Sequence, residues 1–155
     1  MIKVMFVCYG NICRSPMAEY LFRDMVEKLG KGDFFEIASA ATSAEEVGNP
    51  VHSGTKEILS QQGIYPDEKR AVTLTRADYE KYDYLIGMDS WNIKSMLKIT
   101  DGDLAGKIFK LLDFTEEKGD IADPWYTGDF SITYRDIMRG CNGFLEYLDH
   151  NARQL

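Results

Sequence analysis

The segment Cys8–Ser15, with the sequence CYGNICRS, joins a nucleophile to an anion-binding side chain in a cysteine-x5-arginine-serine pattern. A cysteine thiolate is a strong nucleophile. The guanidinium of Arg14 can donate two parallel hydrogen bonds to phosphate oxygens. This pairing points to chemistry on a bound phosphate group or a similar oxyanion.

The same segment has the residue types that a loop curled round an anion requires. Glycine and asparagine, present here as Gly10 and Asn11, are the residue types that adopt left-handed backbone conformations most readily. The N–H groups at the start of a following helix carry partial positive charge and bind oxyanions. We therefore expect phosphate to be held by the residues of this loop, namely Tyr9, Gly10, Asn11, Ile12, Cys13, Arg14 and Ser15.

Cys8 stands at the base of this expected cradle. The helix dipole, the inward amides and Arg14 all favour thiolate over thiol, and the Ser15 hydroxyl can donate to the sulfur. A thiolate behind a bound phosphorus is placed for in-line attack. The alternative is a buried cysteine beside an ordinary helix cap, because a buried cysteine usually behaves as a small hydrophobe.

A thiolate that attacks phosphorus needs a general acid to protonate the leaving oxygen, and then a base to activate water. Asp123 is the best candidate, because Pro124 keeps it out of helical geometry and stiffens its loop. Trp125 and Tyr126 can wall a cleft for an aromatic substrate group. Asp-Pro is also a common turn former, and Asp120 is a rival acid.

Metal and nucleotide chemistry lack their usual sequence signals. The two histidines, His52 and His150, are far apart and are not at metal-ligand spacing from Cys or Asp, so we interpret both as surface residues. Neither G-x-x-x-x-G-K-[ST] nor G-x-G-x-x-G occurs. We expect no metal and no cofactor.

Composition narrows the class of protein. The 155 residues carry 18 basic and 25 acidic side chains, a net charge of −7, with no cluster of Lys and Arg. Such a chain is a poor candidate for binding nucleic acid or anionic membrane. No stretch free of Asp, Glu, Lys and Arg exceeds ten residues, so we expect no membrane insertion. Three cysteines are too few for a disulfide framework, which favours a reducing cytoplasm.

Strands alternate with helices along the chain, which predicts one α/β domain over residues 1–155 with a parallel sheet covered on both faces. Ligands of such sheets bind where a strand turns into a helix, and the loop at residues 8–15 is such a place. Ser15 and Pro16 predict the start of the first helix, as N-cap and first helical residue, and Gly30 its end. The expected strands are 3–7, 34–40, 82–88 and 107–112, the last also compatible with a helix. The other expected helices are 55–62, 89–98 and a long C-terminal helix whose N-cap is Asp129 or Ser131.

Two motifs of this sequence resemble those of a known family. Cys8–Pro16 (CYGNICRSP), followed by Met17–Glu19, closely resembles the signature of the low-molecular-weight protein tyrosine phosphatases, as does Asp123–Tyr126 (DPWY). Shorter stretches also fall where the family has similar residues: Ser43–Gly48, Gly87–Asp89 and Asn92. The resemblance covers nearly the whole chain. It implies a single three-layer α/β domain with a central four-stranded parallel sheet, and a phosphate loop between the first strand and the first helix.

The resemblance also implies an activity, which is metal-independent hydrolysis of phosphotyrosine in proteins or peptides through a phosphocysteine intermediate. Carried over residue by residue, Cys8 is the nucleophile, Arg14 the phosphate clamp and Asp123 the acid and then the base. Asn11 shapes the loop and Ser15 stabilises the thiolate. Inorganic phosphate and other oxyanions are then expected to inhibit.

Cys13 corresponds to the second loop cysteine of the family. The resemblance implies that it forms a disulfide with Cys8 under peroxide, which protects the nucleophile from irreversible oxidation. The alternative role of Cys13 is packing in a tight loop.

Four positions depart from the family pattern. Tyr9, Glu45 and Trp125 stand, together with Tyr126, at expected cleft positions. Tyr9 is where an aliphatic residue is common, Glu45 where Trp, Tyr or Leu is common, and Trp125 where Tyr is common. An acidic Glu45 disfavours acidic phosphopeptides, or is simply a solvated charge. Lys69 stands where many members have a histidine that supports the loop, which puts that hydrogen-bond network in doubt.

Two other functions share parts of this pattern. Arsenate reductases of similar fold use the same cysteine-x5-arginine loop, but they relay oxidation through a further cysteine pair. Only Cys141 follows the loop here, on the apolar side of the last expected helix. A phosphopeptide-binding or redox-sensing module without catalysis would lack the nucleophile or the acid, whereas this chain has both.

Overall fold

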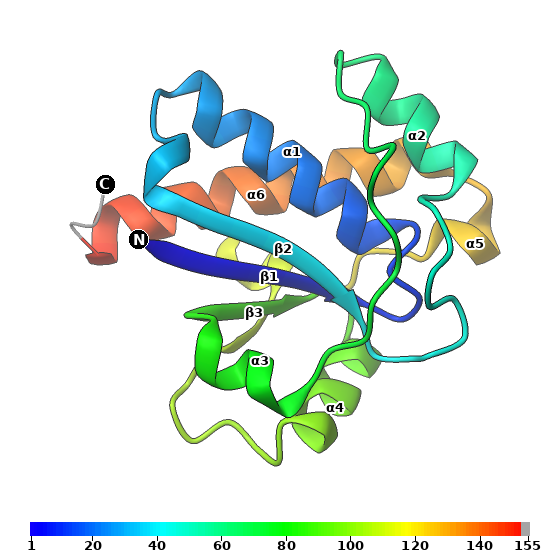
Figure 1. The fold of residues 1–155 in the computed structure, drawn as a ribbon. Helices are drawn as coiled ribbons and strands as arrows, with labels where there is room; N and C mark the ends of the chain where they lie inside the picture. Colours follow the sequence, from blue (N-terminus) through cyan, green and yellow to red (C-terminus); the bar gives the residue numbers. More distant parts are fainter. Residues whose placement is uncertain (153–155) are drawn as a thin grey trace.

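Four parallel strands form the central sheet of the computed structural model, which describes residues 1–152. Their order across the sheet is β2-β1-β3-β4, so the first strand lies inside the sheet with a neighbour on each side (Figure 1). The strands are β1 (Ile2–Cys8), β2 (Phe35–Ala41), β3 (Tyr84–Gly87) and β4 (Ile108–Lys110). The predicted parallel four-stranded sheet is confirmed.

Helices cover both faces of this sheet, as predicted (Figure 1). One face carries α1 (Arg14–Lys28), α2 (Ser53–Ser60) and α6 (Phe130–Ala152), and the other carries α3 (Arg76–Lys81) and α4 (Ser90–Ile99). The short helix α5 (Pro124–Thr127) lies near the carboxyl end of β1 (Figure 1). Two short 3-10 helices complete the set of elements: η1 (Gly32–Phe34) and η2 (Leu111–Phe114).

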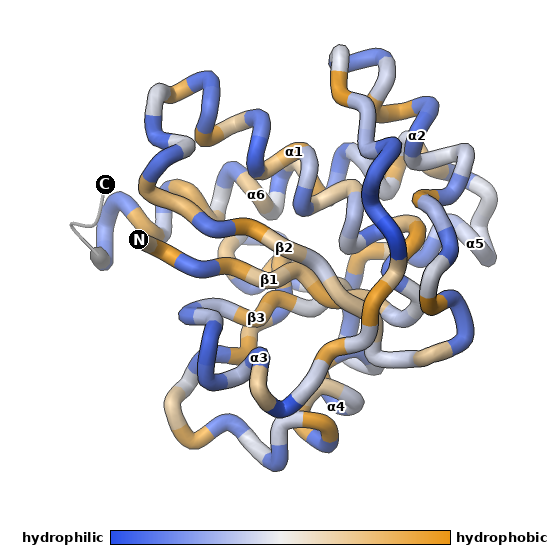
Figure 2. The backbone as a smooth tube through the Cα atoms, in the orientation of Figure 1, coloured by the Kyte–Doolittle hydropathy of each residue, from blue (hydrophilic) through white to orange (hydrophobic). Residues whose placement is uncertain are grey.

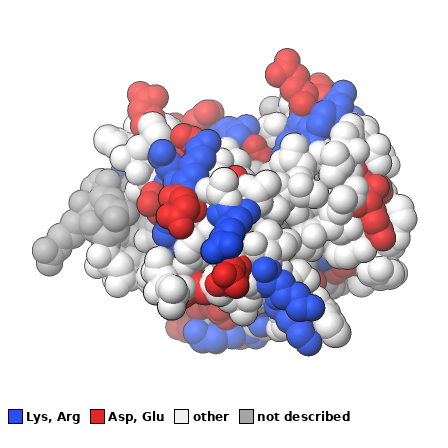
Figure 3. Space-filling model, turned by 60° about the horizontal axis from the view of Figure 1, so that its bottom comes forward, with Lys and Arg blue, Asp and Glu red and all other residues white. Residues whose placement is uncertain are grey.

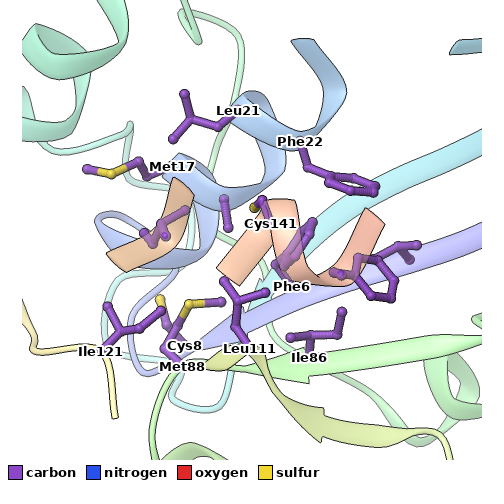
Figure 4. Packing of buried hydrophobic residues seen from close by; sticks show 14 of the residues in the cluster. Phe6, Cys8, Met17, Leu21, Phe22, Ile86, Met88, Leu111, Ile121 and Cys141 are labelled. Atoms are coloured by element: carbon purple, nitrogen blue, oxygen red, sulfur yellow. The ribbon is translucent and has the colours of Figure 1, made fainter. Parts of the chain in front are cut away.

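Strand β1 is buried on both faces because its side chains alternate between two hydrophobic cores. Phe6 and Cys8 point to the core under α1 and α6, where Phe6 meets Phe22 edge to face at 5.7 Å between ring centroids (Figure 4). Met5 and Val7 point to the core under α3 and α4. Figure 2 shows the resulting hydrophobic residues along β1 and β3. The nucleophile expected from the sequence therefore stands at the end of a strand that is buried on both faces.

The predicted start of the first helix differs from the structure. Helix α1 begins at Arg14 with Cys13 as its N-cap and no capping side chain, so Ser15 is not the N-cap and Pro16 is the third helical residue. The predicted end at Gly30 is confirmed, with φ of 72°. Helices α3 and α5 are too short to show hydrophobic periodicity, and they were not predicted. The last predicted strand is confirmed only over Ile108–Lys110, after which the chain turns into η2.

Candidate active site

The loop between β1 and α1 converges on the sulfur of Cys8. Its Sγ accepts hydrogen bonds from the backbone N–H groups of Asn11 at 3.3 Å and Ser15 at 3.4 Å. The Ser15 hydroxyl lies 3.0 Å from the same sulfur and donates when the sulfur is a thiolate. Cys8 is the last residue of β1 and is almost fully buried. Three donors aimed at one sulfur form a binding site for negative charge.

The hydrogen bonds of Ser15 explain why the helix start predicted from the sequence was wrong. A serine before a helix usually accepts a bond from the helix backbone. Here the Ser15 hydroxyl instead contacts Cys8 Sγ and accepts from Asn11 Nδ2 at 2.8 Å. The N–H of Ser15 points at the sulfur rather than at a capping side chain. The free N–H groups in the first turn of α1 are thus available to the interior of the loop, where an anion would bind.

Asn11 braces the loop from behind. It has a left-handed φ of 59°, as expected of the residue type. Its Nδ2 donates to the hydroxyls of Ser15 at 2.8 Å and Ser39 at 2.9 Å, and its Oδ1 accepts from the N–H of Val72 at 3.1 Å. The side chains of Asn11 and Ser15 are buried behind the loop and do not line the cleft.

Lys69 takes part in this network despite its departure from the family pattern. Its Nζ donates to the backbone oxygen of Ser39 at 3.0 Å and lies 4.0 Å from Glu19 Oε1. The Ser39 hydroxyl donates to Glu19, which also pairs with Arg23. Burial lowers the pKa of Lys69, although the neighbouring Glu19 favours the charged form. The supporting network is therefore present, with a lysine and a buried glutamate in it.

Arg14 is held in place by three acceptors. Nη1 donates to Asp89 Oδ2 at 2.6 Å and to the backbone oxygen of Ile121 at 2.9 Å, and Nη2 lies 3.4 Å from Asp123 Oδ2. The residue is only 2% exposed. Burial opposes the charge on the guanidinium, but Cys8, Asp89 and Asp123 outweigh it and raise the pKa of Arg14. The cation is thus fixed in orientation before any ligand binds.

The role of Asp89 was not predicted. Asp89 is the N-cap of α4 and accepts from the N–H of Asn92 at 2.7 Å while its other oxygen pairs with Arg14. A carboxylate two residues after β3 lies at the same sheet edge as the loop after β1, because β1 and β3 are parallel neighbours. The place of Asp89 after this strand was therefore the sequence feature from which its role could have been predicted.

Asp123 faces the same cleft as Cys8 and Arg14. It is the N-cap of α5, and its Oδ1 accepts from the N–H of Trp125 at 3.0 Å. The extended backbone expected before Pro124 is present, with ψ of 114°. The carboxyl is partly exposed, so it is accessible to a substrate in the cleft.

The rival carboxyl, Asp120, is engaged elsewhere. Its Oδ1 accepts from the backbone N–H and the hydroxyl of Ser90, both at 3.1 Å, and from Lys110 Nζ at 3.0 Å. Burial opposes its charge, but the bonds from Lys110 and Ser90 hold the pKa of Asp120 below its usual value. Asp120 does not line the cleft. It is thus a fixed carboxylate, which makes it a poor proton donor.

A cleft of about 120 Å³ opens above the loop. All four predicted cleft residues, Tyr9, Glu45, Trp125 and Tyr126, line it. Trp125 and Tyr126 are 59% and 83% exposed, so they form an outer aromatic wall. Glu46 was not predicted and adds a second carboxylate beside Glu45. The full lining is Cys8, Tyr9, Gly10, Ile12, Cys13, Arg14, Glu45, Glu46, Asp123, Trp125 and Tyr126.

His52, which we interpreted from the sequence as a surface histidine, is partly buried and packs against other side chains. His52 is the N-cap of α2, and its Nδ1 accepts from the N–H of Gly54 at 3.0 Å. Its ring stacks on Phe130 and packs edge to face with Trp125. A histidine as N-cap is uncommon, and nothing in the local sequence indicated the two aromatic neighbours. His150, in contrast, is exposed near the end of α6.

Selective alkylation should separate the loop cysteines. Burial, together with the negative charges of Cys8 and Asp123, raises the pKa of Cys13 to about 12. At pH 7 only about 1 in 100,000 Cys13 side chains is then a thiolate. We expect iodoacetate at pH 7 to carboxymethylate Cys8 and leave Cys13 unmodified, as peptide mass mapping will show. Inorganic phosphate should protect Cys8. Modification of Cys13 first would contradict this assignment, and the pairing of Cys13 with Cys8 stays a prediction.

Neither metal-binding clusters nor membrane-spanning helices occur among residues 1–152. No group of three His, Cys, Asp or Glu side chains could hold a metal ion there, and no helix in this range is long and apolar enough to cross a membrane. On the face drawn in Figure 3, basic and acidic side chains are interspersed.

Comparison with known proteins agrees with this geometry. The model of the family described as low molecular weight phosphotyrosine protein phosphatase matches residues 3–154. The chain is 42% identical over 147 residues to low molecular weight protein-tyrosine-phosphatase YfkJ of Bacillus subtilis, covering 94% of each chain. It is 37% identical to the corresponding phosphatase PtpA of Staphylococcus epidermidis, over 98% of this chain and 97% of that one.

Solved structures agree as well. The crystal structure of Bacillus subtilis YfkJ matches with a TM-score of 0.94 at 40% identity, over 98% of this chain and 97% of that one. The structure of SP-PTP, a low molecular weight protein tyrosine phosphatase from Streptococcus pyogenes, matches with a TM-score of 0.84 at 42% identity, over 97% of this chain and 99% of that one.

Proposed function

Because the chain belongs to the low molecular weight phosphotyrosine protein phosphatase family, and is thus a phosphoric monoester hydrolase, we propose that it hydrolyses phosphotyrosine through a phosphocysteine formed on Cys8. One observation carries this proposal. The Cys8 sulfur, met by the N–H groups of Asn11 and Ser15, lies at the base of a cleft that Arg14 and Asp123 also line.

In the first step the Cys8 thiolate attacks the phosphorus of the ester. The S–P bond forms as the P–O bond to the tyrosine oxygen breaks, and Asp123 donates its proton to that leaving oxygen. The guanidinium of Arg14 and the loop N–H groups bind the equatorial phosphate oxygens. Asp89 and the oxygen of Ile121 keep Arg14 in position, so little reorganisation is needed in the transition state.

In the second step water hydrolyses the phosphocysteine. Asp123, now a carboxylate, takes a proton from the attacking water, the S–P bond breaks, and inorganic phosphate and the Cys8 thiolate are released. The Ser15 hydroxyl stabilises the departing thiolate by the same 3.0 Å contact that it makes in the free protein. Protons and electrons balance over the two steps without a metal or a cofactor.

The substrate we propose is a phosphotyrosine protein or peptide. Tyr9 and Trp125 line the cleft and can flank the aromatic ring of phosphotyrosine. We propose that a phosphoserine ester, which is shorter, does not reach Cys8 past these side chains. Glu45 and Glu46 at the same cleft favour basic residues beside the phosphotyrosine. Inorganic phosphate and related oxyanions compete for the loop. We place the reaction in the cytoplasm, where three unpaired thiols stay reduced.

An arsenate reductase would need a cysteine pair beyond the loop to relay oxidation. The remaining cysteine, Cys141, is fully buried in the core between α1, α6 and the sheet, away from the cleft (Figure 4). This position supports the hydrolase.

The test is hydrolysis of p-nitrophenyl phosphate and of phosphotyrosine and phosphoserine peptides, in the presence of EDTA. We expect turnover that EDTA does not reduce, a preference for phosphotyrosine, faster turnover of peptides flanked by lysine than by aspartate, and competitive inhibition by inorganic phosphate. A folded protein that binds phosphate but turns over none of these esters would overturn the proposal.

A further inference from the structure

His52 stands between the phosphate loop and the aromatic wall of the cleft, and no step of the proposed reaction uses it. It is half-buried at the start of α2, the helix that packs against both α1 and α6. Its backbone N–H contacts the phosphate loop, and its ring contacts Trp125 of the aromatic wall.

The segment 52–55 binds the phosphate loop through one backbone N–H and one side-chain hydroxyl. The N–H of His52 donates to the backbone oxygen of Ile12 at 2.9 Å. The buried hydroxyl of Thr55 donates to the next carbonyl, that of Cys13, at 3.1 Å. Both partners are carbonyl oxygens, so these two bonds occupy none of the N–H groups of the loop.

The ring of His52 lies between two other aromatic rings. It stacks on Phe130 with centroids 5.1 Å apart, and it meets Trp125 edge to face at 5.8 Å and 81°. Within residues 1–152, no other aromatic ring packs against Trp125. The bond from the N–H of Gly54 to Nδ1 orients the ring. Gly54 also lets Phe130 approach closely, since a Cβ there would lie 2.4 Å from Phe130 Cζ.

Trp125 needs such support because more than half of its surface is exposed. Its own N–H donates to Asp123, so the tryptophan belongs to the loop that presents the acid. A single ring, that of His52, links this loop to Phe130 and to the start of α2.

We propose that His52 is a positioning residue that holds the indole of Trp125 as the wall for the aromatic ring of the substrate. The proposal rests on the function proposed above. It predicts that His52 acts on binding of the aromatic group and leaves binding of the phosphate group alone. The ring of His52, rather than its hydrogen bond to Gly54, carries the effect.

Two variants separate the ring from the hydrogen bond. His52→Asn keeps an acceptor for the N–H of Gly54, because asparagine is a good N-cap, and removes the ring. His52→Phe keeps a ring and removes the acceptor. The backbone bond to Ile12 survives in both. His150→Asn, the same change at an exposed position near the end of α6, is the matched control.

For His52→Asn we expect the KM for phosphotyrosine to rise about threefold to tenfold. This factor corresponds to the free energy that one edge-to-face aromatic contact contributes. The inhibition constant of inorganic phosphate, which needs only the loop, should stay within about twofold of wild type. His52→Phe should keep a KM near wild type and melt at a lower temperature. In a Trp125→Ala background, His52→Asn should raise KM no further.

A fluorescence measurement does not depend on activity. In a Trp91→Phe background the single remaining tryptophan is Trp125. His52→Asn should then lower the fluorescence anisotropy of Trp125 and raise its quenching by acrylamide, and His150→Asn should change neither.

The outcomes are distinct. The proposal is wrong if His52→Asn changes the KM for phosphotyrosine and the inhibition constant of phosphate by the same factor, or if it changes neither. It is also wrong if His52→Phe raises KM as much as His52→Asn does. If the wild type shows no turnover that depends on Cys8, the proposed function fails, and the anisotropy of Trp125 alone decides whether His52 holds the indole.

Discussion

Replacement of Cys8 by serine is expected to lower kcat/KM for phosphotyrosine by at least about a thousandfold, because loss of a covalent nucleophile removes the main reaction path. A serine hydroxyl is a much weaker nucleophile than a cysteine thiolate. Asn11 and Ser15 are also joined by a side-chain hydrogen bond, and Arg14 is held by Asp89 and the oxygen of Ile121, so the loop keeps contacts that do not involve the sulfur. Phosphate binding, measured by calorimetry, should therefore persist in Cys8→Ser.

Cys141→Ala is the matched control for this variant. It also removes a buried thiol, but from the core between α1, α6 and the sheet. It is expected to lower the free energy of unfolding by about 1 kcal/mol and leave kcat unchanged. Turnover by Cys8→Ser comparable to wild type would show that Cys8 is a structural cysteine and that the nucleophile lies elsewhere.

Replacement of Asp123 by asparagine is expected to slow reaction with a poor leaving group far more than with a good one. Phenyl phosphate should lose about 100-fold to 10,000-fold in kcat/KM, the usual contribution of a general acid. Nitrophenolate leaves with little protonation, so kcat/KM for p-nitrophenyl phosphate should fall by about tenfold or less. Asparagine is also a good N-cap, so α5 and the bond from Trp125 should be retained.

Asp120→Asn is the control for the acid. Asp120 is bound by Ser90 and Lys110 outside the cleft, so this variant should show no dependence on the leaving group. Equal slowing of phenyl and nitrophenyl esters would move the acid role away from Asp123, and Asp120 would be tested next.

The fold was predictable where local pattern and packing agree. The apolar strand ending at Cys8, the helix stop at Gly30 and the alternation of strands with helices each follow from rules that need no distant partner. The places of Cys8 and Arg14 followed from the same rules, because a strand-to-helix turn at a sheet edge positions both. The misplaced start of α1 had a local cause of its own, since Ser15 bonds the sulfur rather than the helix backbone.

The remaining site residues depend on contacts between distant segments. Asp89 reaches Arg14 across 75 positions, and the oxygen of Ile121 reaches it across 107. His52 showed no signal because its partners Trp125 and Phe130 come from α5 and α6. Sequence spacing identifies residues that act together within one loop, whereas these contacts depend on how the loops at one sheet edge meet.

Trapping the covalent intermediate tests the central claim most directly. Asp123→Asn is to be mixed with p-nitrophenyl phosphate, quenched in acid within milliseconds, digested and analysed by mass spectrometry. Loss of the general base slows hydrolysis of the phosphoenzyme, so we expect one phosphoryl group on the peptide that contains Cys8, and none in the additional Cys8→Ser variant. Turnover with no phosphoryl group on Cys8 at any quench time, or with phosphate attached to another residue, would contradict the mechanism.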